Sequence, residues 1–224
     1  MVDSSKANRK YTYRRNKLIE KLRGKGIKDE NVLSAMNAVP RHSFVDTALE
    51  KRAYEDSALP IGKGQTISQP YTVAAQTELL EVAPGNKILE IGTGSGYQSA
   101  ILCEMEADVF SVERHEELYL RARKILQDLN CRIRIKLGDG TLGWSAYAPY
   151  DRILVTAGAP VVPRELIGQL SPGGKLVVPV GDQEKQMMVR VTRISEDAYE
   201  EEHFDNFKFV PLIGRKGWKE EDQR

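Results

Sequence analysis

The sequence is poor in the residues that build metal centres and disulfide frameworks. Its 224 residues include 2 cysteines and 3 histidines. Cys103 and Cys131 form no C-x-x-C pair and have no histidine close by in the sequence, which argues against both a structural zinc site and a disulfide framework. We therefore expect no metal, and two unpaired thiols are typical of the reducing cytoplasm.

Long apolar runs and an excess of one charge are missing as well. No stretch approaches the roughly 18 consecutive apolar residues of a membrane-spanning helix. The charged N-terminal residues are followed by no apolar segment typical of a secretory signal. Lys and Arg number 33 and Asp and Glu 32, for a formal net charge of +1, so no general attraction to nucleic acid or membranes is expected. We expect a cytoplasmic monomer.

The most informative stretch is KILEIGTGSGY, residues 87–97. Its apolar start predicts a buried parallel strand, and its glycines lead into a predicted helix. Such a turn brings backbone N–H groups and the positive end of a helix to one point, as in nucleotide sites at the carboxyl edge of a sheet. Tyr97 stands where a dinucleotide fingerprint has its third glycine, which disfavours a dehydrogenase. With Glu90 before the glycines, the pattern resembles the first motif of methyltransferases that use S-adenosylmethionine.

Strands and helices alternate from about residue 86 to 180, which predicts right-handed βαβ units and a parallel sheet. Two later stretches, 187–194 and 207–213, predict an antiparallel pair of strands. The expected fold class is therefore α/β: a doubly wound, mostly parallel, Rossmann-like sheet of seven strands with an N-terminal helical addition. We expect residues 1–80 to carry the N-terminal helices and a binding loop, and 81–218 to form the core. Both parts would make one compact domain, followed by a disordered tail at 219–224.

Two acidic residues at predicted strand ends are candidates for nucleoside contacts. Glu113 follows a predicted strand at 108–112, about 20 residues after the first glycine, where a carboxylate can accept hydrogen bonds from ribose hydroxyls. Asp139 lies between two glycines after the next strand. It could reach an adenine amino group, although Asp-Gly is also simply a turn.

Several segments together resemble protein-L-isoaspartate O-methyltransferases, over roughly residues 10 to 218. The glycine motif is shared by many methyltransferases, whereas the sequence GQTISQP is much narrower and resembles a signature of this family. The matching segments are VPRHSFV (39–45), LPIGKGQTISQPY (59–71), LEIGTGSGY (89–97), the Gly-Asp-Gly at 138–140, YDRILVTAGAP (150–160), SPGGKLVVPVG (171–181) and FVPLIGRKGW (209–218).

The resemblance implies an enzyme of protein repair. Such an enzyme uses S-adenosyl-L-methionine to esterify the α-carboxylate of L-isoaspartyl residues in damaged proteins and peptides, and leaves S-adenosyl-L-homocysteine. The ester then collapses to a succinimide, whose hydrolysis returns some normal aspartate. A carboxylate is already ionised at neutral pH and needs no general base. That agrees with the absence of a convincing His/Asp or Cys/His constellation in the sequence.

The resemblance also implies a set of site residues. Ser68 corresponds to the active-site serine and would orient the substrate carboxylate. The cofactor would be bound by Ser68 together with Gln65, Thr66, Ile67, Val73, Glu90, Gly92, Thr93, Gly94, Gly96, Glu113, Arg114, Asp139 and Gly140. The peptide would be held by Ser68 and by Val210, Pro211, Leu212 and Ile213.

Other functions remain open at this level. A nucleic-acid methyltransferase is disfavoured, because the sequence has neither an Asn/Asp-Pro-Pro-aromatic motif nor a Pro-Cys pair and its charge is nearly balanced. A small-molecule methyltransferase is disfavoured by the GQTISQP segment alone. A non-catalytic nucleotide-binding module would bind adenosylmethionine without transferring its methyl group.

Overall fold

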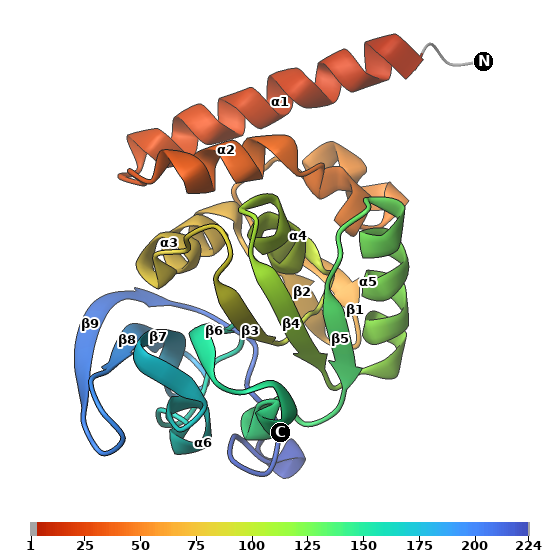
Figure 1. Cartoon of the computed structure of the whole chain (residues 1–224). Helices are drawn as coiled ribbons and strands as arrows, with labels where there is room; N and C mark the ends of the chain where they lie inside the picture. The colour runs from red at the N-terminus through yellow and green to blue at the C-terminus, as the bar shows by residue number, and fades with distance from the viewer. Residues whose placement is uncertain (1–3, 224) are drawn as a thin grey trace.

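The computed structural model describes residues 4–223, and its centre is a seven-stranded sheet in the order β5-β4-β3-β6-β7-β8-β9 (Figure 1). Strands β5, β4, β3, β6 and β7 are mutually parallel. Strand β8 is antiparallel to both of its neighbours, which confirms the mostly parallel α/β sheet. The strands are β3 (Lys87–Ile91), β4 (Asp108–Glu113), β5 (Arg134–Leu137), β6 (Tyr150–Val155), β7 (Leu170–Gly181), β8 (Gln186–Arg193) and β9 (Tyr199–Phe207).

Helices cover both faces of this sheet, and a small antiparallel hairpin of two further strands precedes α3. The α-helices are α1 (Ser4–Gly24), α2 (Glu30–Ala38), α3 (Pro70–Leu80), α4 (Tyr97–Glu104), α5 (Glu116–Asp128) and α6 (Arg164–Ile167). The hairpin strands are β1 (Leu59–Gly62) and β2 (Gln65–Ile67). Short 3-10 helices are η1 (Arg41–Phe44), η2 (Thr47–Arg52), η3 (Gly140–Leu142), η4 (Ser145–Tyr147) and η5 (Glu220–Gln223).

Successive residues of the central strands enter two different hydrophobic clusters. In β3, Ile88 packs into the cluster that includes α1 to α5, whereas Leu89 and Ile91 pack into the one that includes α6 and the C-terminal Leu212. All three side chains are at most 1% exposed. A strand covered on both faces needs apolar residues at every position instead of at alternate ones. This explains the continuous apolar run that marks β3 in the sequence.

The N-terminal addition, which comprises the described residues before β1 (4–58), packs on the helices that follow it. Helix α2 contacts α3 and α4, and α1 lies outside α2 at one end of the molecule (Figure 1). Asp29 caps α2, because its carboxylate accepts hydrogen bonds from the N–H groups of Asn31 and Val32. Glu78 of α3 in turn accepts from the N–H groups of Lys28 and Asp29. The addition is thus joined to the core by hydrogen bonds as well as by apolar contacts.

The prediction of a last strand at 207–213 is wrong, because the last strand is β9 at Tyr199–Phe207. Its sequence, YEEEHFDNF, has almost no apolar alternation, and most of its residues are exposed. An edge strand with a mostly exposed surface needs no apolar face, and its charged side chains disfavour pairing of its free edge with another strand. The stretch from 171 to 174 belongs to β7, which is continuous from Leu170.

The described C-terminal residues differ from the expected disordered tail. Glu220–Gln223 form η5, and Glu220 is paired with Arg114. Residue 224 lies outside the described residues.

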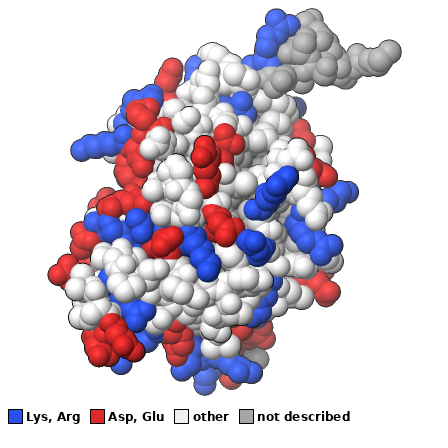
Figure 2. All heavy atoms as spheres, viewed as in Figure 1, with Lys and Arg blue, Asp and Glu red and all other residues white. Residues whose placement is uncertain are grey.

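Both signs of charge are present on the face drawn in Figure 2, where Lys and Arg are interspersed with Asp and Glu among uncharged residues. None of the helices found among residues 4–223 is long and apolar enough to cross a membrane.

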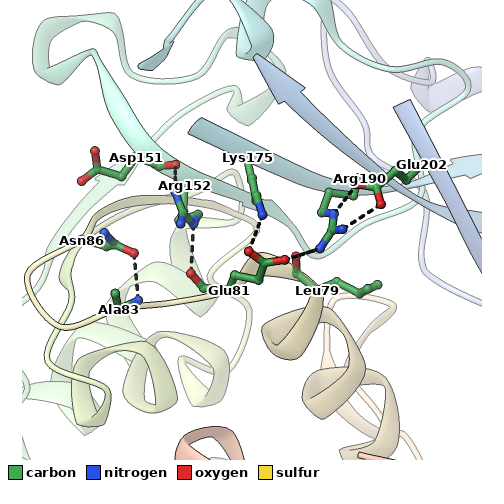
Figure 3. A network of polar contacts seen from close by, with 9 residues as sticks. All are labelled: Leu79, Glu81, Ala83, Asn86, Asp151, Arg152, Lys175, Arg190 and Glu202. Atoms are coloured by element: carbon green, nitrogen blue, oxygen red, sulfur yellow. Dashed lines mark hydrogen bonds and ion pairs between the residues drawn. The ribbon is translucent and has the colours of Figure 1, made fainter. Parts of the chain in front are cut away.

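One polar network ties the end of α3 to β7, β8 and β9 (Figure 3). Glu81 follows α3 in the left-handed region (φ 52°), and its carboxylate pairs with Lys175 and Arg190. Arg190 also forms two hydrogen bonds with Glu202, of 2.7 and 2.8 Å, and its side chain is 15% exposed. Because Arg190 serves two carboxylates and is largely shielded from water, it contributes more than a surface ion pair does.

We expect Arg190→Met to lower the free energy of unfolding by about 1–3 kcal/mol, since Glu202 loses its partner and Glu81 keeps only Lys175. Arg134→Met is the matched control. Its ion pair with Asp108 is about half exposed on both sides, and its loss should cost less than about 1 kcal/mol. Urea denaturation measures both, and equal losses would contradict the prediction.

Candidate active site

A cavity opens at the carboxyl ends of β3, β4 and β6, where the glycine turn, the β2–α3 loop and a C-terminal segment meet. Its walls are both polar and apolar. The lining residues are Gln65, Thr66, Ile67, Ser68, Val73, Gln76, Ile91, Gly92, Thr93, Gly94, Ser95, Tyr97, Gln98, Val112, Glu113, Arg114, His115, Gly140, Thr156, Ala157, Val210, Pro211, Leu212 and Ile213.

The glycine turn after β3 passes close to the end of β6. The hydroxyl of Thr156 lies 2.9 Å from the carbonyl oxygen of Ile91 and 2.6 Å from that of Gly92. A Cβ on Gly92 would lie 2.5 Å from the Thr156 hydroxyl oxygen, and Gly92 has a φ of +95°. Both the close contact and the backbone conformation require glycine. The turn therefore exposes main chain to the cavity at its glycines, beside Thr93 and Ser95, which also line it.

Glu113, at the end of β4, faces the glycine turn. One carboxylate oxygen accepts a 2.7 Å hydrogen bond from the N–H of Gly94, and the other a 2.8 Å bond from the N–H of His115. Each oxygen can accept a further bond. Glu113 is 4% exposed and lines the cavity. It can thus fix the glycine turn and still bind two hydroxyl groups of a ligand.

Beneath the turn lies a second carboxylate, Glu90, which is completely buried. It accepts hydrogen bonds from the hydroxyls of Ser99 and Ser111, and Ser111 is in turn 2.6 Å from the hydroxyl of Thr93. The other carboxylate oxygen has no partner among the described residues. Burial raises the pKa of Glu90 to about 7, helped by the charge of Glu113 and opposed by the two serine hydroxyls. Glu90 is therefore linked to the glycine turn through the hydroxyls of Ser111 and Thr93.

Ser68 lies between β2 and α3, where the chain turns into the helix. Helix α3 begins at Pro70, and proline is well suited to the first position of a helix. Ser68 is half-buried and lines the cavity. It also lines a second, adjoining hollow.

The C-terminal segment reaches the cavity by pairing with the chain that follows β6. The N–H of Gly158 donates to the carbonyl of Val210, and the N–H of Leu212 donates to the carbonyl of Gly158, each over 2.8 Å. Asp139 holds the next turn, because its carboxylate accepts a 2.8 Å hydrogen bond from the N–H of Arg215. A Cβ on Gly214 would lie 2.1 Å from the same carboxylate, so glycine permits this approach.

Most of the residues expected at the site line this one cavity: Gln65, Thr66, Ile67, Ser68, Val73, Gly92, Thr93, Gly94, Glu113, Arg114, Gly140, Val210, Pro211, Leu212 and Ile213. Three expected cofactor residues do not line it. Glu90 lies below the turn, Gly96 begins α4 with a φ of +88°, and Asp139 is bonded to Thr141 and Arg215.

Sequence reasoning missed other lining residues, among them Gln76, Tyr97, Gln98, His115 and Thr156. Tyr97 was noted only as the residue that replaces a glycine. Gln98 and Gln76 lie on helices, where their polarity at buried positions was the available signal: they are 7% and 1% exposed.

The histidines form no acid–base constellation with the cavity residues. His42 stacks on Tyr11 with ring centroids 3.9 Å apart and is 2.7 Å from the Tyr54 hydroxyl, and His203 lies on the edge strand β9. His115 lines the cavity, and its backbone N–H binds Glu113. Within the described part of the chain, no group of three His, Cys, Asp or Glu residues could hold a metal ion.

The buried carboxylate makes stability depend on pH. Between pH 4.5, the ordinary pKa of Glu, and about 7, the folded protein keeps a proton on Glu90 that the unfolded chain has released. The free energy of unfolding should therefore fall as the pH rises through this window. In Glu90→Gln that fall is removed. The free energy of unfolding of the variant should therefore rise relative to that of the wild type by roughly 3 kcal/mol between pH 4.5 and pH 7.5. Urea denaturation at several pH values measures the difference, and parallel profiles would contradict it.

Comparison with known proteins agrees with the geometry of the cavity. A family model described as protein-L-isoaspartate(D-aspartate) O-methyltransferase matches residues 13–217. A protein-L-isoaspartate O-methyltransferase from Salinibacter ruber is 54% identical over 223 residues, which are 95% of this chain and 97% of that protein.

Solved structures share the fold. A protein-L-isoaspartate O-methyltransferase has a TM-score of 0.82 at 27% identity, over 91% of this chain and 67% of that one. A Plasmodium falciparum protein described with the same name, solved with S-adenosyl-L-homocysteine, has a TM-score of 0.77 at 24% identity, over 88% and 97% of the two chains. The chain belongs to the protein-L-isoaspartate(D-aspartate) O-methyltransferase family, as the resemblance of its sequence indicated.

Proposed function

We propose that the chain uses S-adenosyl-L-methionine to esterify the α-carboxylate of L-isoaspartyl residues in damaged proteins and peptides, and so initiates repair through a succinimide. The observation that carries this proposal is the position of Ser68. It lies where the cavity under the glycine turn joins the adjoining hollow, and it lines both. A group that orients a peptide carboxylate next to a cofactor must be within reach of both binding spaces.

The residues of the cavity fit an adenosylmethionine. Glu113 has unused acceptor capacity for ribose hydroxyls, and Ile91 and Val112 supply an apolar wall for a base. The side-chain oxygen of Gln98 is buried in the cavity wall and has no partner among the described residues, so a ligand donor would satisfy it. When bound, the cofactor supplies an activated methyl group on a sulfonium.

The residues around Ser68 suit the orientation of an anion better than proton transfer. A substrate carboxylate is ionised at neutral pH, so no general base is required. The Ser68 hydroxyl can donate a hydrogen bond to one carboxylate oxygen and leave the other directed at the cofactor space. Alignment of this kind lowers the barrier by proximity. Val210 and Pro211 also line the cavity, and their apolar side chains help to exclude water.

The adjoining hollow supports a peptide as substrate over a small molecule. It shares Thr66, Ser68, Thr156 and Val210 with the cavity. Beyond them it is lined by the aromatic residues Tyr71, Phe207 and Phe209, by Ala58, and by the polar and charged residues Gln69, Thr72, Glu184, Lys185, Asn206 and Lys208. A hollow that adjoins Ser68 and has both aromatic and polar walls can accommodate residues that flank an isoaspartate.

We further propose that the chain acts as a cytoplasmic monomer that binds neither nucleic acid nor membranes. The near balance of 33 Lys and Arg against 32 Asp and Glu supports the absence of binding to nucleic acid and membranes. The free thiols of Cys103 and Cys131 suit a reducing compartment.

The function is tested with one synthetic peptide in two forms, one carrying L-isoaspartate and the other L-aspartate. Each form is incubated with the protein and methyl-labelled adenosylmethionine, and base-labile label is counted. We expect label on the isoaspartyl form alone. Equal label on both forms, or none on either, would contradict the proposal.

Glu113→Ala should weaken adenosylmethionine binding by about 1.5–3 kcal/mol, because charge-assisted hydrogen bonds to the ribose are lost. Isothermal titration calorimetry measures the affinity. Glu116→Ala, an exposed acid on the first turn of α5, is the matched control and should leave the affinity unchanged. An unchanged affinity in Glu113→Ala would show that this residue does not bind the cofactor.

Ser68→Ala should lower kcat for the isoaspartyl peptide by about 10–100-fold through poorer alignment, with the Kd for adenosylmethionine within about twofold of the wild type. Ser195→Ala, at an exposed turn between β8 and β9, is the control. A loss of cofactor affinity as large as the loss of kcat would refute the orienting role.

A further inference from the structure

The most unusual side chain outside the cavity is Arg41, which is 0% exposed. Burial of a guanidinium is costly unless its charge is paired and hydrogen-bonded. Arg41 is bonded to two main-chain carbonyls: Nε donates to Ala53 over 2.9 Å and Nη2 to Ser68 over 2.8 Å. Its second terminal nitrogen has no hydrogen-bond partner among the described residues. An apolar residue of similar volume would fill the space with less desolvation, so packing alone does not account for this arginine.

The contacts of Arg41 join three segments that meet at the site. Ala53 belongs to the N-terminal addition, and Ser68 is the residue proposed to orient the substrate. The guanidinium also lies over the ring of Tyr97, 4.7 Å from its centroid, and Tyr97 lines the cavity at the start of α4. A planar fork of donors can hold two carbonyls and an aromatic face in a fixed mutual arrangement, which an ammonium cannot do.

We infer that Arg41 is a positioning residue: by holding the carbonyl of Ser68 it fixes the peptide plane after Ser68 and so the direction of the Ser68 hydroxyl. This inference rests on the proposed role of Ser68. The carbonyl belongs to the same residue as the hydroxyl, so rotation of that peptide plane changes ψ of Ser68 and moves its side chain relative to the cavity. No contact of Arg41 with substrate or cofactor is required.

A separate contact holds the other side of the turn. Asp56, whose side chain is 0% exposed, accepts a 2.9 Å hydrogen bond from the N–H of Tyr71 and pairs with Lys25 over 2.6 Å. The start of α3 therefore has an anchor besides Arg41, and the charge of this anchor also acts on the Arg41 guanidinium. Loss of Arg41 should release the Ser68 peptide plane while α3 and the cofactor cavity stay in place.

The test is a double-mutant cycle between Arg41→Lys and Ser68→Ala, since Ser68→Ala removes the hydroxyl but keeps the carbonyl that Arg41 binds. Alone, Arg41→Lys should lower kcat for the isoaspartyl peptide by about 10–100-fold, with the Kd for adenosylmethionine within about twofold. In the Ser68→Ala background it should cost less than about threefold, because no hydroxyl is left to position. Equal losses in both backgrounds would overturn the inference.

Two further variants complete the experiment. Arg14→Gln is the matched control: Arg14 also donates to a main-chain carbonyl of the addition, that of Lys51 over 2.9 Å, and its loss should leave kcat unchanged. If Arg41→Lys does not fold, Arg41→Met takes its place in the cycle, because an apolar residue removes the cost of the buried charge. Failure of both to fold would also overturn the inference, since Arg41 would then serve the fold. Lack of methylation by the wild type would instead refute the proposed function.

Discussion

The site depends on the close approach of the turn after β3 to the end of β6. Thr156 bonds to the carbonyls of Ile91 and Gly92, and no side chain fits at Gly92. With the main chain so close, the N–H of Gly94 reaches the carboxylate of Glu113 on the next strand. The ends of three parallel strands are thus joined by hydrogen bonds, and these strand ends form the floor of the cavity. A ligand that fits there meets the main chain of the glycine turn and the fixed carboxylate of Glu113.

Two buried ionisable groups hold segments that border the cavity without lining it themselves. Glu90 accepts hydrogen bonds from two serine hydroxyls, and Arg41 donates to the main-chain carbonyls of Ala53 and Ser68. Each has one polar atom without a partner among the described residues, so neither is an economical source of stability. Arg41 instead fixes main chain that borders the cavity, whereas Glu90 is linked to the glycine turn through the hydroxyls of Ser111 and Thr93. Polar groups of this kind order a site at some cost to the free energy of folding.

Local sequence patterns were sufficient to predict the core of the fold and the part of the site formed by the glycine turn and Glu113. The continuous apolar run of β3, the glycines after it and the acid at the end of β4 lie close together in the chain, and parallel strands bring their carboxyl ends to one edge. Glu113 and Gly94 are therefore predictable as neighbours from order alone. The placement of Ser68 came from the resemblance to a family, since a loop sequence by itself does not show which cavity it borders. Strand β9 was missed because an exposed edge needs no apolar alternation.

The sequence by itself determined the α/β architecture, the position of the glycine turn and the family to which the chain belongs. Only the tertiary structure decided what closes the cavity and what holds it in place. The pairing of Val210 and Leu212 with Gly158, and the bond between Arg41 and Ser68, connect residues 27 to 54 positions apart in the sequence. Such contacts depend on how packed elements are placed in space, and no local pattern of residues encodes that placement.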